Sequence, residues 1–191
     1  MAKRRLKRLP VVADDGSLLG IVSRADILGA LSHTAHAAGR LNVLPHATGQ
    51  LASDIMTAAP TAQPDTPLAD VLELIMASPL RRVVVVDAEG VIQGLIHDRD
   101  LIEYYSRRNQ PDLLSRLIRI FASAQAKTAG FSGIAAEVMQ REVHTVRPQT
   151  PLADVIQEMV RLQIKRIIVT DEGNRLLGII DRNVLLAALS S

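Results

Sequence analysis

Three short polar clusters are the places where this sequence could do chemistry, and each follows a short apolar run that contains a glycine. They are Ser23-Arg24-Ala25-Asp26, His97-Asp98-Arg99-Asp100 and a third that starts at Asp181. A serine followed three residues later by an acidic residue forms a capping box at a helix start, and that arrangement needs no ligand. Asp181 alone is also a good helix cap. The clusters therefore predict helix starts, and a binding role for them stays open.

Catalytic chemistry has no recognisable motif in this sequence. There is no cysteine, no Gly-x-Ser-x-Gly and no phosphate-binding loop ending in Gly-Lys-Ser/Thr. His33 and His36 are spaced like metal ligands on one helical turn, but no cysteine or acidic residue stands near them. We therefore expect neither an enzyme nor a metal site.

The composition describes a chain that can build a hydrophobic core almost without aromatic residues. Of the 191 residues, 48% are hydrophobic and 2% are aromatic, and the net charge is +2. Five basic residues crowd into positions 3–8, but a solvated end explains them, and the scarcity of aromatic rings argues against nucleic-acid binding. No apolar run approaches the roughly 20 residues of a membrane span. The absence of cysteine fits a reducing compartment, so we expect a cytoplasmic protein.

One supersecondary pattern occurs nearly three times along the chain. Residues 81–102 read RRVVVVDAEGVIQGLIHDRDLI, residues 8–28 read RLPVVADDGSLLGIVSRADIL, and residues 166–186 read RIIVTDEGNRLLGIIDRNVLL. Each string has two short apolar runs around an acidic, glycine-containing turn, which predicts a β-hairpin followed by a helix.

Two of the three copies are preceded by a further strand and helix. Thr66-Pro67-Leu68-Ala69-Asp70-Val71 recurs 84 residues later as Thr150-Pro151-Leu152-Ala153-Asp154-Val155. The pattern predicts a helix with Thr66 as its N-cap and Pro67 as its first residue. The full unit is strand, helix, strand, strand, helix, with a parallel crossover and then an antiparallel hairpin. Each sheet keeps an apolar face, so two units are expected to pair through their sheets.

The predicted domain organisation follows from these copies. It comprises a partial repeat with hairpin and helix only (1–31), a linker (32–50), a repeat (51–108), a connecting helix (109–133) and a second repeat (134–191). The connecting helix carries an apolar stripe that includes Leu117 and Ile118. We expect this stripe to be buried either in the core or at a dimer contact. The first copy is incomplete. We expect a piece of a longer protein in preference to a short product whose half-repeat packs on a partner subunit.

The two complete copies resemble the cystathionine-β-synthase (CBS) domain. The matching strings are DIMT…PDTPLADVLELIMASPLRRVVVVDAEGVIQGLIHDRDLI and EVMQ…PQTPLADVIQEMVRLQIKRIIVTDEGNRLLGIIDRNVLL. The resemblance covers residues 8–31, 53–105 and 136–189, about two thirds of the chain. It implies an α+β fold of tandem CBS repeats, a Bateman-type pair with the C-terminal half of a further repeat at its start.

The resemblance also implies a ligand. The similarity to this family implies a sensor that binds AMP, ADP, ATP or S-adenosylmethionine in a cleft between paired repeats. Such a cleft needs an apolar slot for adenine, an acceptor for the ribose hydroxyls, and a helix N-terminus with a cation for phosphate. The implied contacts are Thr61, Ala62, Arg82, Val83, Val84, His97, Arg99 and Asp100 in the first full repeat, and Ser23, Arg24 and Asp26 in the half-repeat.

The copies depart from the family pattern to different degrees. Asp100 keeps the ribose position, but His97 replaces the family's serine or threonine. In the second full repeat, Val184 cannot hold a ribose and Asp181 places a negative charge where phosphate would lie, which predicts a degenerate site. Helix capping alone is the alternative explanation for Asp26 and Asp100.

Two functions follow as expectations. The first is a regulatory module that senses an adenosine-containing nucleotide, forms a homodimer, needs no cofactor, and relays binding through repeat or subunit packing to an attached or partner effector protein. The second is a non-catalytic dimerisation scaffold with degenerate clefts. Replacing Asp100 separates them, because nucleotide binding depends on this carboxylate under the first function alone.

Overall fold

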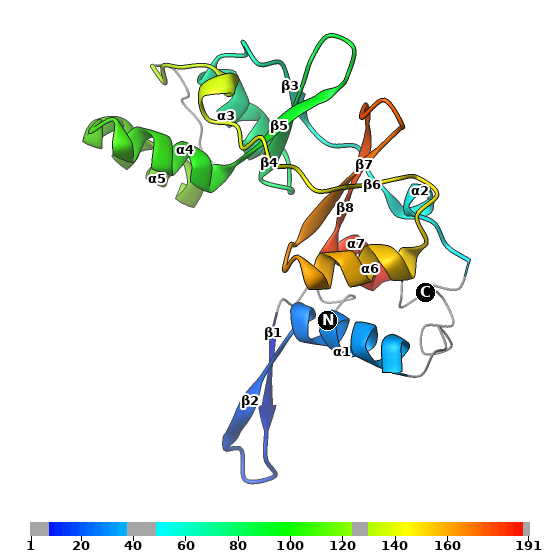
Figure 1. Cartoon of the computed structure of the whole chain (residues 1–191). Helices are drawn as coiled ribbons and strands as arrows, with labels where there is room; N and C mark the ends of the chain where they lie inside the picture. Colours follow the sequence, from blue (N-terminus) through cyan, green and yellow to red (C-terminus); the bar gives the residue numbers. More distant parts are fainter. Residues whose placement is uncertain (1–7, 38–48, 124–129, 189–191) are drawn as a thin grey trace. The chain divides into compact units, whose positions relative to one another are not determined.

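The computed structural model describes residues 8–37, 49–123 and 130–188 (Figure 1). The chain divides into two compact units. Unit 1 contains Met1–Thr57, Thr145–Val169 and Gly178–Ser191, and unit 2 contains Ala58–His144 and Thr170–Leu177. Most of the basic cluster at positions 3–8 and of the predicted linker lies outside the described residues. In the described part, no helix combines the length and the hydropathy needed to cross a bilayer.

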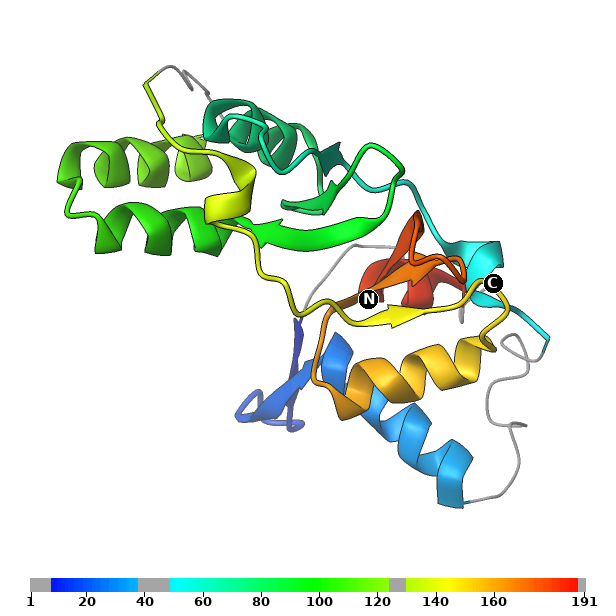
Figure 2. The ribbon, with the colours of Figure 1, turned by 45° about the horizontal axis from the view of Figure 1, so that its top comes forward.

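Two complete copies of the predicted pattern are present (Figures 1 and 2). The first consists of β3 (Thr61–Ala62), α3 (Leu68–Ala77), β4 (Arg82–Val86), β5 (Ile92–His97) and α4 (Asp98–Arg107). The second consists of β6 (Thr145–Val146), α6 (Leu152–Arg161), β7 (Arg166–Thr170), β8 (Leu176–Asp181) and α7 (Arg182–Ala188). A short helical turn precedes each copy, namely α2 (Ala52–Ile55) and η2 (Ala135–Glu137). The order strand, helix, strand, strand, helix is confirmed.

Each full repeat builds a three-stranded sheet, in the orders β3-β4-β5 and β6-β7-β8. β3 is parallel to β4 and β6 is parallel to β7, because a helix connects the members of each pair. β4 and β5 are antiparallel, because a tight turn joins them. The predicted parallel crossover and antiparallel hairpin are therefore both confirmed for the first full repeat.

The core of unit 2 forms between its sheet and the apolar face of α3. Leu68, Val71, Leu72 and Ile75 are buried there at the spacing of one helical face. Helix α5 (Pro111–Ser123) adds Leu117, which is fully buried in the same core, whereas Ile118 is 52% exposed. Adjacent residues of a helix point about 100° apart, so Ile118 lies outside the buried face to which the predicted stripe assigned it.

The start of α3 differs from the prediction. Pro67, not Thr66, occupies the N-cap position, and Leu68 is the first helical residue. The hydroxyl of Thr66 instead accepts a hydrogen bond from Gln63 N at 2.8 Å, closing the turn before the helix. Proline has no donor, and the first helical N–H, from Leu68, is satisfied by Gly133 O at 3.0 Å. A distant segment of the chain thus caps this helix.

The first hairpin, β1 (Arg8–Val12) with β2 (Leu18–Ser23), has the register of β4 with β5, including the irregularity near the turn. Helix α1 (Arg24–Ala37) follows and continues beyond residue 31, where the predicted partial repeat ends, because no glycine or proline interrupts the chain between Leu31 and Ala37. Leu28 of α1 is buried in the core of unit 1 together with α6 and α7.

Within each unit, the outer strand of a full repeat pairs with a short segment from far along the chain. In unit 1, Thr57 and Ile179 exchange backbone hydrogen bonds of 2.9 and 2.8 Å. In unit 2, Gln140 and Leu95 exchange two bonds of 2.9 Å. Thr57 follows α2 and Gln140 follows η2, so these helical turns and the residues after them act as edge partners for the two sheets. We call residues 53–57 and 136–140 the start segments.

The chain leading into the second start segment is fixed to α4. The Tyr105 hydroxyl donates to Ser132 O at 2.8 Å, and the Tyr104 hydroxyl donates to the Glu137 carboxylate. Gly133 has a positive φ of 109°, and a Cβ there would lie 2.5 Å from the Tyr104 hydroxyl. Glycine is therefore required at this position for two independent reasons.

Candidate functional site

The predicted contacts of the first full repeat all lie in unit 2, around one end of its sheet. Thr61 of β3 is the neighbour of Val84 in β4. At the start of β4, Arg82 lies opposite His97, the last residue of β5. Asp100 stands in the first turn of α4, directly after that strand. Residues from two strand ends, an edge strand and a helix start therefore meet in one region.

The predicted contacts lie on both faces of this sheet. Ala62 and Val83 belong to the hydrophobic core, so their side chains have no free surface and just their backbone groups could meet a ligand. The register places Thr61, Arg82 and Val84 on the opposite face. Leu95, the antiparallel partner of Val84, lies on this face as well. The prediction missed Leu95, although strict alternation from His97 along β5 would have found it.

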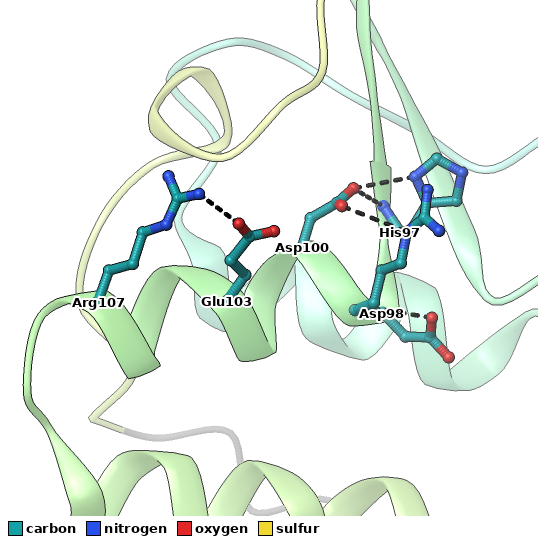
Figure 3. A network of polar contacts seen from close by, with 6 residues as sticks. His97, Asp98, Asp100, Glu103 and Arg107 are labelled. Atoms are coloured by element: carbon teal, nitrogen blue, oxygen red, sulfur yellow. Dashed lines mark hydrogen bonds and ion pairs between the residues drawn. The ribbon is translucent and has the colours of Figure 1, made fainter.

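His97 and Asp100 form the centre of the site (Figure 3). Asp100 Oδ2 accepts the backbone N–H of His97 at 2.8 Å and lies 2.9 Å from His97 Nδ1. A carboxylate can only accept, so Nδ1 carries the proton. The other oxygen, Oδ1, lies 3.7 Å from Nε of the exposed Arg99, which is an ion pair longer than a hydrogen bond.

The environment of Asp100 keeps its carboxylate charged. The residue is 4% exposed, and this burial raises its pKa. The side-chain and backbone hydrogen bonds from His97, with the nearby charges of His97 and Arg99, outweigh burial, so the pKa of Asp100 lies below its ordinary value. The site therefore holds a buried anion at the N-terminus of α4.

The lowered pKa of Asp100 gives a testable dependence of stability on pH. The contribution is present above the unfolded pKa of about 4 and is lost as the pH falls through the lower folded pKa. We expect Asp100→Asn to flatten the loss of stability between neutral and acidic pH, as measured by urea midpoints in a pH series. Parallel curves for the two proteins would show that other groups cause the acid sensitivity.

Ser23, Arg24 and Asp26 are the predicted contacts of the half-repeat. They belong to unit 1, whereas the contacts described above belong to unit 2. Ser23 N donates to Asp26 Oδ2 at 2.7 Å, and Asp26 N donates to Ser23 Oγ at 3.3 Å. This is the reciprocal capping box, and these bonds from Ser23 lower the pKa of Asp26. The alternative of capping thus accounts for both side chains.

In the second full repeat, the equivalent position is closed by an ion pair. Arg166 Nε lies 2.7 Å from Asp181 Oδ2, and their side chains are 16% and 8% exposed. Asp181 Oδ1 also accepts the Asn183 N–H at 2.7 Å, so Asp181 caps α7. Arg166 is the counterpart of Arg82 in this repeat. The expectation of a degenerate site stays a prediction.

No metal centre is found among the residues that the structure describes, because nowhere do three His, Asp or Glu side chains gather. The side chains of His33 and His36 lie outside the described part. Other charged pairs near the site, such as Glu103 with Arg107 on α4, are exposed and lie along the helix surface (Figure 3). The arrangement offers a buried acceptor, cations and a sheet edge, which suit recognition of a polar ligand.

Comparison with known proteins identifies relatives over most of the chain. The sequence profile of the CBS domain matches residues 1–33, 52–107 and 135–191. The uncharacterized protein MJ1426 of Methanocaldococcus jannaschii is 26% identical over 152 residues, which cover 73% of this chain and 90% of that protein.

Two solved structures have a similar fold. An uncharacterized conserved protein from Pyrococcus horikoshii matches with a TM-score of 0.67 at 20% identity, over 98% of this chain and 70% of that one. CBSX2, a protein of Arabidopsis thaliana whose structure was solved in complex with AMP, matches with a TM-score of 0.55 at 25% identity, over 74% of this chain and 98% of that one. Because the family profile matches more than half of its residues, the chain belongs to the CBS-domain family.

Proposed function

We propose that this chain is a non-catalytic regulatory module that binds an adenosine-containing nucleotide beside Asp100. One observation carries the proposal. Asp100 is a buried carboxylate at a helix start, the hydrogen bonds from His97 both go to its Oδ2, and its Oδ1 lies 3.7 Å from Nε of Arg99. A ribose hydroxyl would donate to this second oxygen.

The surroundings of Asp100 provide the other groups that a nucleotide requires. β3 is the edge strand of its sheet, so its outer backbone groups can bond to an adenine ring. Arg82 and Arg99 supply positive charge beside the N-terminus of α4, which suits phosphate. CBSX2, 25% identical to this chain, was solved with AMP, which supports the same ligand class here.

Titration calorimetry with AMP, ADP, ATP and S-adenosylmethionine tests the proposal directly. We expect at least one of them to bind, and Asp100→Ala to weaken that binding by about tenfold or more. Asp98→Ala is the matched control, because the Asp98 carboxylate bonds to the backbone N–H of Arg99, away from Asp100. Silence of the folded protein with all four ligands would overturn the proposal.

His97 gives a second prediction about the same site. Its ring lies against Asp100 Oδ2 where the family pattern has a small hydroxyl residue, so it competes with a ligand for the carboxylate. We expect His97→Ser to keep the helix cap and to tighten nucleotide binding by about tenfold. Calorimetry on the two proteins measures the change. Weaker binding in the serine variant would mean that the imidazole itself contacts the ligand.

The proposed regulation acts through packing. A nucleotide can shift the arrangement of repeats or subunits only by binding one arrangement more tightly than another. We propose that the protein forms a homodimer and that an attached or partner effector protein reads the change. Sedimentation with and without the bound nucleotide tests the first part.

A dimerisation scaffold is the second candidate, and the capping roles favour it. Asp26, Asp100 and Asp181 all hold backbone N–H groups at helix starts, so each has a structural explanation. Under this function Asp100→Ala leaves self-association intact and no nucleotide binds. The same titration therefore separates the two candidates.

A further inference from the structure

A methionine of each start segment lies directly over a glycine of the outer strand. A Cβ added at Gly94 would lie 3.0 Å from both Cβ and Cγ of Met139, and one added at Gly178 would lie 3.1 Å from the same two atoms of Met56. Each glycine therefore leaves the space that a methionine side chain fills. The first contact lies within unit 2 and the second within unit 1, so the two full repeats make it independently.

The backbone bonds that attach each start segment come from the residue after the methionine. Gln140 follows Met139 and exchanges two hydrogen bonds of 2.9 Å with Leu95. In unit 1, Thr57 exchanges hydrogen bonds of 2.9 and 2.8 Å with Ile179. Any change that lifts a methionine off its glycine thus also pulls on the bonds that complete the edge of the sheet.

The four methionines of the described residues differ in their surroundings. Met56 and Met139 are half-buried and pack against the hydrophobic cores of their units. Met159 is 1% exposed inside the core of unit 1. Met76 is also half-buried, but its sulfur accepts a hydrogen bond of 3.0 Å from the Arg81 guanidinium. The two methionines of the start segments therefore combine partial access from solvent with a contact that depends on apolar packing.

A half-buried thioether can be oxidised without unfolding of the protein. Its sulfur gives two electrons to hydrogen peroxide, and an S–O bond forms as the O–O bond breaks. The departing hydroxide takes the proton of the transferred oxygen and leaves as water. The product, methionine sulfoxide, is polar, and an apolar contact over a glycine cannot satisfy its oxygen.

We propose that Met56 and Met139 are sites of oxidation by peroxide, and that the sulfoxide releases each start segment from the edge of its sheet. The effect is reversible, because methionine sulfoxide reductases return the oxygen as water while two thiols are oxidised to a disulfide. The device is independent of any nucleotide, since it acts on the edge strands β5 and β8.

The test is peroxide treatment of the full chain, with peptide mass spectrometry to locate the added oxygen and amide exchange by NMR to follow the sheet edges. We expect Met56 and Met139 to be oxidised while Met159 is spared. Exchange at Leu95 and Ile179 should become about tenfold faster or more, because the buried contact does not tolerate an unsatisfied polar group.

Two leucine variants separate the proposed sites from general damage. The double variant Met56→Leu with Met139→Leu keeps the size and apolar character of both side chains, so it should fold and lose the response to peroxide. Met76→Leu is the matched control, because it removes a half-buried methionine outside the start segments, and it should respond as the original chain does.

Reduction by the two methionine sulfoxide reductases, one for each epimer, supplies a second measurement. Exchange at Leu95 and Ile179 that returns to its original rate after reduction supports the proposal. Oxidation of Met159 ahead of Met56 and Met139, or oxidation of those two with unchanged exchange, would overturn it. The same holds for faster exchange that persists in the double leucine variant or that reduction fails to reverse.

Discussion

Exchange of Arg166 for methionine is expected to destabilise unit 1 by about 3 kcal/mol, because the change leaves a buried carboxylate without its cation. Arg166 Nε lies 2.7 Å from Asp181 Oδ2, and the Asp181 side chain is 8% exposed. Asp181 keeps its bond to the Asn183 N–H, which replaces a small part of the lost interaction. Urea unfolding followed by circular dichroism gives the change in midpoint.

Two further variants separate the unpaired charge from the lost packing. The double variant Arg166→Met with Asp181→Asn removes both charges, and we expect it to recover much of the stability. Arg161→Met removes a cation from the exposed pair with Glu158, where Arg161 is 64% exposed, and should shift the urea midpoint far less than Arg166→Met does. Equal losses for Arg166→Met and Arg161→Met would show that the buried pair has no special role.

Alanine at Gly94 or Gly178 is expected to destabilise the fold by about 1–3 kcal/mol for each change, since the new methyl group would overlap a start segment. The contact at Gly94 is the closer of the two, with 2.8 Å to a backbone oxygen that cannot turn away, so Gly94→Ala should have the larger effect. Thermal or urea unfolding measures both variants, and amide exchange at Leu95 and Ile179 reports whether the start segment has detached.

Gly20→Ala is the control for this pair within the same chain. The residue has the same place in its hairpin, but no described atom lies within 4 Å of the added carbon. We expect stability to be unchanged or slightly raised, because alanine restricts the unfolded chain. A loss at Gly20 equal to that at Gly94 would mean that all three glycines serve the strand backbone and not a close approach.

The repeats and their elements could be predicted because their signals are local. Apolar periodicity located α3 and α6, and the acidic turns located the hairpins. The family resemblance rested on the order of these local patterns. It assigned Asp100 to the ribose position, and the structure shows a buried carboxylate at this residue, while the ribose role stays a prediction.

The remaining features depend on contacts between distant residues, which no local pattern encodes. The sequence predicted Thr66 as the cap of α3. In the structure, the backbone N–H of Leu68 donates to Gly133 O, and the Thr66 hydroxyl accepts from Gln63 N. Ala62 and Val83 looked like lining residues, but sheet register turned their side chains into the core. The contact of His97 with Asp100 depends on a side-chain rotamer, and the sequence specified just the spacing of the pair.

The capping of α3 by Gly133 and the pairing of Leu95 with Gln140 also constrain how the protein can be made. Translation delivers the chain from its N-terminus, so strand β5 leaves the ribosome before residues 133–140 do. During that interval the first full repeat has an open edge and an uncapped helix, and it cannot reach its final state. Truncated chains that end at residue 108 and have been released from the ribosome should therefore be cut readily by protease, whereas released chains that extend past residue 140 should be more resistant in unit 2.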